Sequence, residues 1–474
     1  MIGCRLHKQP ILLGFAVCLA FLGVIGKSSA QSFVETLVAV YETNPQILAE
    51  RARQRGADEG VARALGGWRP TVTLFGEQGR ASDDLRQNVQ PGNTTVRSSQ
   101  QRSPLSAGVQ IRQPIWDGGR TPAEIQRAEQ NVLRGMAALE ATEQQVLLEA
   151  IGAHADLARD IQIRKLVAEN VEKLTEQRRI VAQRMLARDA TRTDEAQADT
   201  RIARSMADRE AADGALEVTR SSYMRVVGRP AGDSPQTVPP PPPNLLPVSL
   251  DEIRTRVGQN PELRAASVAI AIAEADVDIA LSALRPDVSL RAAMRRLNQQ
   301  DSPNFGRDIK EVLLSLNIPL YDAGVASARS REALHAVGQR QIELDQARRR
   351  VTDQSRRAWE QIRASRARIG AIEQQIRSGE IAVASLDQEV RVGTRTLTER
   401  LDAEQELLNA RIELERSKRE ILIAQYQLLA ALGRLDVVSL GLPIERYDPR
   451  EHYNATRGRF FGTGILREYP ENRE

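Results

Sequence analysis

Two acidic side chains late in the chain form a candidate pair for binding cations. Glu399 and Asp402 lie three residues apart, so on a helix they occupy neighbouring positions of one face. Their combined field would attract cations, including multivalent ones. The same spacing has a plainer explanation, because acids near the start of a helix also favour the positive end of its dipole. The spacing alone fits both a cation site and two solvated acids.

Residues suited to bond chemistry are scarce. His154, His335 and His452 are widely spaced, and they do not occupy equivalent positions in the two halves of the chain, so neither a metal site nor a Ser-His pair is indicated. Cys4 and Cys18 lie in an N-terminal segment that we expect to be removed, which leaves no thiol. No glycine-rich phosphate-binding motif occurs. We therefore predict a protein that is not an enzyme, with no catalytic residue, no cofactor and no metal site.

Residues 1–30 have the order of a secretory signal peptide. A basic start precedes the apolar run 11–25, and small residues flank a cleavage site before Gln31. About 15 apolar residues are fewer than the ~20 that a retained membrane helix needs, and the bulky residue before Cys18 disfavours a lipoprotein. No later stretch resembles a transmembrane helix, so we expect any membrane crossing to be made by β-strands.

The charge and composition exclude two further classes of protein. Without residues 1–30 the formal charge falls from +4 to +1, with 63 basic and 62 acidic residues. No basic run dominates the remainder, so we predict no nucleic-acid partner. Aromatic residues make up 4% of the chain and charged residues 27%. This composition is typical of long solvated helices and disfavours a large α/β enzyme.

One unit occurs twice in the chain. Asn44-Pro45 precedes Arg69-Pro70 by 25 residues, and the Asn-Pro and Arg-Pro pairs at 260–261 and 285–286 have the same separation. Later matches at a shorter offset place a longer surface loop in the first copy. The predicted domains are a signal peptide (1–30), a first repeat of a helix, two strands and long helices (31–237), a proline-rich linker (238–248), a second repeat (249–434) and a C-terminal tail (435–474).

Each copy is expected to contain two amphipathic strands with one apolar face. The apolar positions that alternate with polar ones are Val72, Leu74, Leu105, Ala107, Val109 and Ile111 in copy one, and Val288, Leu290, Ala292, Met294, Val312, Leu314, Leu316 and Ile318 in copy two. Each run has about the ~9–11 residues of a tilted transmembrane strand. Trp116 and Tyr321, at strand ends, could belong to an interfacial aromatic belt.

Long helices are expected at about 121–187 and 323–390, where no proline interrupts the interior, and each could reach roughly 100 Å. A seven-residue spacing predicts supercoiled packing, and it links Ile362, Ile369, Ile376, Val383 and Val390. The helices alone would also suit a soluble coiled coil. Four strands cannot close a barrel, however, and lipid does not tolerate open strand edges, so several chains must share one barrel.

The segment 392–403, VGTRTLTERLDA, resembles the turn between paired helices at the periplasmic tip of the TolC-like outer membrane factors. The corresponding segment of the first copy is 188–194, which matches the family's turn less well because Arg188 stands in place of the usual glycine. The Asn-Pro, Arg-Pro and Pro-Ile-Trp-Asp-Gly-Gly motifs also fit, so the resemblance covers about residues 33–435.

The resemblance implies an α+β membrane protein of the cell outer membrane that extends into the periplasm. It would be a homotrimer with a twelve-stranded β-barrel, four strands per chain, continued by a coiled-coil α-helical tunnel. The implied partners are outer membrane lipid, an inner-membrane ABC transporter and a periplasmic adaptor of a type I secretion system, with an unfolded protein toxin as cargo. Two alternatives stay open, namely a duct for small-molecule multidrug efflux and a periplasmic coiled-coil scaffold without a pore.

The resemblance also implies roles for five residues at the tip. Glu399 and Asp402 would line the narrow periplasmic entrance, with six carboxylates in a trimer. Arg395 would help to hold the tip closed by bonding to Thr193 and Asp194, since its planar fork gives several directed hydrogen bonds. A tyrosine that often contacts the aspartate in the family is replaced here by Val390, which puts the Asp194 link in question.

Overall fold

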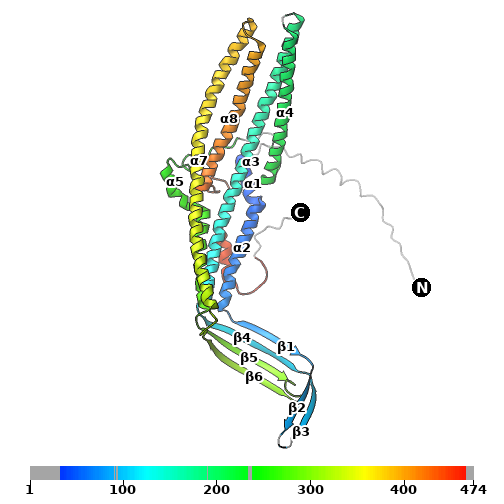
Figure 1. Ribbon diagram of the computed structural model, residues 1–474, viewed down its shortest axis with the longest axis vertical. Coiled ribbons are helices and arrows are strands. Elements are labelled where there is room, and N and C mark those ends of the chain that lie inside the picture. The colour runs from blue at the N-terminus through cyan, green and yellow to red at the C-terminus, as the bar shows by residue number, and fades with distance from the viewer. Residues whose placement is uncertain (1–31, 90, 92–93, 189, 233–236, 466–474) are drawn as a thin grey trace, which may run out of the picture. The chain divides into compact units, whose positions relative to one another are not determined.

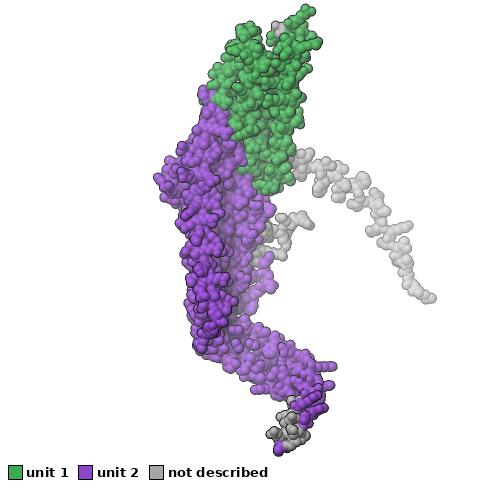
Figure 2. Space-filling model, in the orientation of Figure 1, with its two compact units in different colours: residues 1–37, 152–239, 375–416 green, residues 38–151, 240–374, 417–474 purple. Residues whose placement is uncertain are grey.

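The computed structural model describes residues 32–465 apart from 90, 92–93, 189 and 233–236. The predicted signal peptide and the end of the predicted tail lie outside the described residues. The chain divides into two compact units, distinguished in Figure 2. Unit 1 contains residues up to 37, 152–239 and 375–416, and unit 2 contains 38–151, 240–374 and 417 onward. Each unit takes segments from both predicted repeats, whose boundaries stay a prediction.

Two helices of 67 residues each dominate the chain, and at 1.5 Å per residue each is about 100 Å long. They begin and end within two residues of the predicted limits. The helices are α1 (Phe33–Thr43), α2 (Pro45–Leu65), α3 (Arg120–Leu186), α4 (Arg192–Val227), α5 (Leu250–Arg256), α6 (Pro261–Ser282), α7 (Val325–Arg391), α8 (Leu397–Ala431) and α9 (Pro449–Arg457), with short 3-10 turns at Gly66–Trp68 and Val257–Gln259 (Figure 1). None of these described helices is long and apolar enough to cross a membrane.

The two Asn-Pro pairs are helix starts. The side chain of Asn44 accepts a hydrogen bond from the backbone N–H of Gln46 at 2.9 Å, and Asn260 accepts one from Glu262 at 2.8 Å. The proline that follows each asparagine needs no partner for a backbone N–H, and its fixed φ suits the first turn. The repeated spacing in the sequence therefore marks the starts of α2 and α6.

Helix α3 buries an apolar stripe at Val132, Leu139, Val146, Ala150 and Leu157. The stripe predicted for α7 is less complete, because Ile362 and Val390 are buried while the three positions between them are half-buried. Within unit 2, α7 packs against α8, α5 and α6 around a core of Val351, Ile362, Leu428, Leu432, Ile253 and Leu263. The helical core is thus thin, as the low aromatic content indicated.

The four predicted strands form one antiparallel sheet in the order β1-β4-β5-β6. Their bounds are β1 (Thr71–Gln78), β4 (Leu105–Asp117), β5 (Asp287–Asn298) and β6 (Gly306–Asn317). β1 and β6 are the edge strands, and no other described strand pairs with their outer edges. The sheet leaves the helices where α2 and α6 end and where α3 and α7 begin (Figure 1).

The longer loop predicted in copy one is instead a second hairpin, β2 (Ala81–Val89) and β3 (Thr94–Arg102). Its strands are mostly polar, so the sequence has no apolar alternation from which to predict them. They are held by their mutual backbone pairing and by cross-strand contacts such as the 2.8 Å ion pair between Arg102 and Asp83.

Glycines turn the chain from strand into long helix. Gly118 and Gly119 have φ angles of 69° and 90°, and Gly324 has a φ of 80°. These left-handed conformations cost glycine little. At Gly118 a side chain would also meet the backbone, because a Cβ there would lie 2.6 Å from the carbonyl oxygen of Ser282.

Candidate functional site

One face of the four-stranded sheet is apolar, and no part of the described chain covers it. Side chains alternate between the two faces of a strand, and the observed register aligns the predicted apolar positions across the sheet. Leu290 lies opposite Leu314, and Leu74 lies opposite Val109. We call this surface the apolar face. It comprises Val72, Leu74, Val109, Ile111, Leu290, Met294, Val312, Leu314 and Leu316, which are between 38% and 80% exposed.

The opposite face of the sheet is mostly polar. It includes Gln110, Arg112 and Arg291, and an ion pair of 3.6 Å joins Arg295 to Glu311. Soluble monomers rarely leave a contiguous apolar surface of this extent open, and open strand edges favour pairing with another chain. This sheet is therefore built for contact with an apolar medium on one side and with water on the other.

Polar and aromatic residues mark the two ends of the apolar face. At the end far from the helices, Arg296 and Asp308 form a paired contact of two hydrogen bonds, at 2.8 and 2.9 Å. At the end next to the helices, Trp116 is 47% exposed and Tyr321 is 88% exposed. These are the positions that an interfacial aromatic belt would require.

The predicted entrance residue Glu399 lies in the first turn of α8. Its carboxylate accepts hydrogen bonds from the backbone N–H and the hydroxyl of Thr396, at 2.9 and 3.1 Å. Arg395 donates to it at 3.0 Å and lies 3.4 Å from Glu389. These contacts hold the pKa of the Glu399 carboxyl below its ordinary value, and the hydrogen bond from the Thr396 backbone N–H has the largest effect. The carboxyl group therefore stays charged at neutral pH.

The second entrance residue, Asp402, pairs with Arg201 of α4. The Thr398 hydroxyl and the side-chain oxygen of Gln197 share a hydrogen bond of 2.6 Å between the same two helices. The sequence motifs did not identify Arg201, because it lies outside the segment that resembles the family's tip. Within the described chain no group of three or more His, Cys, Asp or Glu is arranged to hold a metal ion.

The predicted partners of Arg395 lie at the start of α4. Asp194 forms a capping box with Thr191, accepting hydrogen bonds from its backbone N–H at 2.9 Å and its hydroxyl at 2.8 Å. Thr193 is an exposed residue of the same first turn. Within one chain the structure pairs Arg395 with Glu399 and Glu389 instead. The link from Arg395 to Thr193 and Asp194 therefore stays a prediction for the assembled protein.

The departures from the family pattern at the tip have local structural consequences. Arg188, where the family usually has glycine, adopts a left-handed φ of 63°, close to the 79° of Gly393 in the other tip turn. A residue other than glycine pays a conformational cost there. Val390 is 8% exposed and has no hydroxyl with which to contact Asp194.

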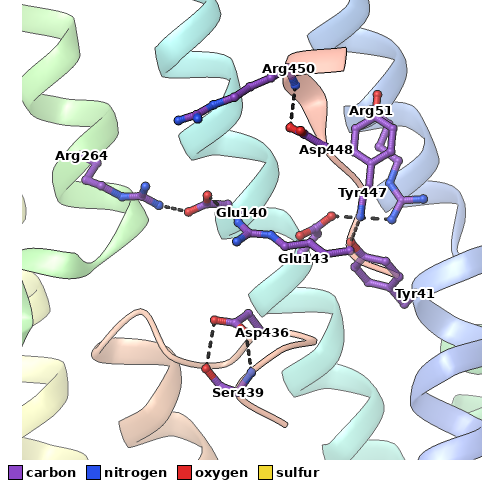
Figure 3. Close-up of polar contacts among 11 residues, drawn as sticks. Tyr41, Arg51, Glu140, Glu143, Arg264, Asp436, Ser439, Tyr447, Asp448 and Arg450 are labelled. Carbon is purple, nitrogen blue, oxygen red and sulfur yellow. Dashed lines mark hydrogen bonds and ion pairs between the residues drawn. The ribbon is translucent and has the colours of Figure 1, made fainter. Parts of the chain in front are cut away.

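A cluster of polar contacts that sequence analysis missed holds the C-terminal region against α1, α2, α3 and α6 (Figure 3). The backbone N–H of Tyr447 donates to the Tyr41 hydroxyl at 3.2 Å, and the Arg51 guanidinium lies over both rings, 4.6 and 4.7 Å from their centres. Arg446 and Arg264 both pair with Glu140. We call these contacts the C-terminal clamp. The contacts of Arg446 with Glu140 and of Tyr447 with Tyr41 join residues 306 and 406 positions apart, so no local pattern predicts them.

Helix α9 is fixed on α2 by a buried hydrogen-bonded group. His452 Nδ1 lies 2.8 Å from the Asp58 carboxylate, and the Gln54 amide donates to the same carboxylate at 3.0 Å. All three side chains are buried. Burial raises the pKa of Asp58, an effect that the hydrogen bond from His452 partly offsets. Part of the predicted tail is therefore structured, since it contains α9.

Replacing Asp58 with alanine is expected to reduce the free energy that holds α9 on α2 by about 1.5–3 kcal/mol, because it leaves His452 and Gln54 buried without this partner. Limited trypsin digestion followed by mass spectrometry should show faster cleavage after Arg457. Glu59→Ala, at the exposed neighbouring position, is the matched control. Equal cleavage rates in the two variants would show that this group does not hold α9.

Comparisons with known proteins identify the family and the fold of this chain. The profile of the family described as outer membrane efflux protein matches residues 37–229 and 254–434. The outer membrane efflux protein BepC of Brucella suis is 29% identical over 455 residues, which cover 95% of this chain and 96% of BepC. Protein CyaE of Bordetella pertussis is 29% identical over 394 residues, 81% of this chain and 80% of CyaE.

Among solved structures, the outer membrane protein VceC of Vibrio cholerae superposes with a TM-score of 0.72 over 85% of this chain and 96% of that chain. The identity is 17%, so this similarity concerns the fold. The predicted resemblance to the TolC-like factors is confirmed by the family match. The chain therefore belongs to the outer membrane efflux protein family, whose members are channel proteins rather than enzymes, located in the outer membrane and extending into the periplasm.

Proposed function

We propose that three copies of this chain form a passive exit duct, in which four strands from each copy close one twelve-stranded barrel. The observation that carries this proposal is the exposed apolar face with its two open edges. Lipid cannot satisfy unpaired backbone groups, so these edges must pair with further strands. Strand direction alternates along the sheet, which leaves β1 and β6 antiparallel to each other. The β6 edge of one copy can therefore continue into the β1 edge of the next without changing the pattern.

The length of the strands supports the same proposal. β5 has 12 residues, about 40 Å at ~3.3 Å per residue, and at the ~35–45° tilt of outer membrane barrels it would rise about 30 Å, enough to cross the ~25 Å apolar band. The polar face would then line the water-filled interior. The long helices would continue the duct into the periplasm, with Glu399 and Asp402 at its entrance.

The duct itself has no source of energy in this proposal, so partners must supply energy and select cargo. The first candidate is a type I secretion system, in which an inner-membrane ABC transporter and a periplasmic adaptor deliver an unfolded protein toxin. The similarity to the alkaline protease secretion protein AprF and to the proteases secretion protein PrtF supports this assignment. The second candidate is small-molecule efflux, supported by BepC, which aligns with a larger share of the chain. A scaffold without a pore leaves the apolar face unexplained.

Deletion of the gene, followed by assays of extracellular protein and of drug sensitivity, separates the two cargo classes. A secretion duct predicts loss of one or a few large proteins from the medium with unchanged drug sensitivity. An efflux duct predicts increased drug sensitivity with unchanged extracellular proteins. Expression of the wild-type chain from a plasmid should restore either function, and failure of the deletion to affect either measurement would contradict a role as exit duct.

A further inference from the structure

After α9 the described chain ends in an apolar and aromatic segment, residues 458–465, which we call the C-terminal aromatic segment. Phe460 is 57% exposed, Phe461 is 85% exposed and Ile465 is 79% exposed. The two phenylalanine rings contact each other, with their centres 5.1 Å apart. Exposed side chains of this kind, adjacent in sequence, mark a contact surface more often than a solvated loop.

The C-terminal aromatic segment is attached to the base of the sheet by Arg69. The Arg69 guanidinium lies over the Phe460 ring, 4.2 Å from its centre, and donates a hydrogen bond to the carbonyl oxygen of Arg459 at 3.1 Å. Arg69 stands two residues before Thr71, the first residue of β1. The Arg69 side chain therefore connects the Phe460 ring to the backbone just before β1.

The equivalent arginine of the sequence repeat has a different contact. Arg285 donates to the carbonyl oxygen of Gly118 at 3.1 Å and so joins the start of β5 to the end of β4. Arg69 instead holds the C-terminal aromatic segment. Directly before this segment, α9 is held on α2 by the buried pair of Asp58 and His452. Both attachments act at the start of the segment and place Arg459 and Phe460 at the level of the junction between helix and strand.

At this level the apolar face of the sheet also begins. Val72 is 66% exposed, and Trp116 and Tyr321 are the exposed aromatic residues of the strand ends. Aromatic side chains are enriched where a membrane protein meets the membrane–water interface. Arg459, beside the two phenylalanines, is suited to a lipid phosphate group while its stem lies along apolar surface, whereas Arg457 pairs with Glu129 at 2.9 Å.

We propose that the C-terminal aromatic segment is a lipid anchor, with Phe461 and Ile465 inserted into the periplasmic leaflet of the outer membrane. Its partner is the lipid surface, because the exposed aromatic pair lies at the level where the apolar face begins and has a basic residue, Arg459, directly before it. The proposal rests on the membrane-crossing role proposed for the sheet. It adds a contact that the strands do not make, and this contact would set the depth of each copy in the bilayer.

The expected absence of cysteine from the mature chain allows a direct test. Single variants Phe461→Cys, Val312→Cys and Val248→Cys are labelled with an environment-sensitive fluorophore and reconstituted into phosphatidylethanolamine and phosphatidylglycerol vesicles that contain brominated lipid. Val312 lies on the apolar face, and Val248, 88% exposed, lies in the predicted linker. The labelling of the unmodified chain checks the absence of other thiols, and Ile465→Cys repeats the measurement at a second position of the segment.

The anchor predicts strong quenching at positions 461 and 312 and little at 248. Quenching at 312 together with quenching at 461 and 465 as weak as at 248 would overturn the anchor and leave the proposed duct standing. Intermolecular crosslinking through position 461 in place of quenching would overturn it too, by assigning the segment to a neighbouring copy. Weak quenching at all four positions would overturn both the anchor and the membrane role of the sheet.

Discussion

Leu314→Arg is expected to abolish assembly of the protein in the outer membrane, whereas Leu313→Arg is expected to be tolerated. The two residues are neighbours on β6, and both are exposed in the single chain, at 71% and 51%. Leu314 belongs to the apolar face, while Leu313 points to the polar face. An arginine facing lipid near the middle of the bilayer costs about 2–4 kcal/mol, and a trimer would carry three of them.

Sucrose-gradient fractionation and crosslinking measure this difference. The Leu313→Arg variant should accumulate as trimers in the outer membrane fraction at a level close to that of the unmodified chain. The Leu314→Arg variant should be recovered as monomers or be degraded. If both variants assembled equally well, the apolar face would not be the lipid-facing surface.

Removing both entrance carboxylates, with Glu399→Gln and Asp402→Asn, is expected to weaken block of the channel by divalent cations about tenfold or more. In a trimer this change removes six negative charges from one constriction, and rings of carboxylates attract cations in channel entrances. The contacts of Glu399 with Thr396 and Arg395 lower the pKa of its carboxyl, so Glu399 is ionised at neutral pH. Single-channel currents at increasing concentrations of a divalent cation measure the effect.

Replacing Arg201 is expected to have the opposite effect on block by divalent cations. It pairs with Asp402 across α4 and α8, so Arg201→Gln should free that carboxylate and strengthen divalent block. Glu195→Gln, near the start of α4, changes the charge of the tip without touching this pair and serves as the control. If the double variant and Arg201→Gln both left the block unchanged, Glu399 and Asp402 would be ordinary solvated acids.

The features that could be predicted from sequence depend on residues that lie close together in the chain. The alternation in residues 288–294 and 312–318 placed β5 and β6, and it assigned Leu314 to the apolar face. The long stretches without a proline in their interior gave α3 and α7 to within two residues of their observed ends. The two Asn-Pro pairs, found as a repeat, are helix caps, because the cap and the first turn involve adjacent residues.

The features that escaped prediction depend on residues far apart in the chain. Arg201 and Asp402 are 201 positions apart, and His452 and Asp58 are 394 apart, so no spacing rule brings either pair together. The β2–β3 hairpin escaped for another reason. Its strands are polar on both faces, and they lack the alternation by which a half-buried strand is recognised.

Assembly of this chain into a pore is tested most directly by single-channel recording in planar lipid bilayers. The purified protein, extracted with detergent, should insert and give unitary current steps of one uniform size. The Leu314→Arg variant, prepared in the same way, should give none. A wild-type protein that extracts without detergent and produces no current steps would contradict the claim and would favour a periplasmic scaffold.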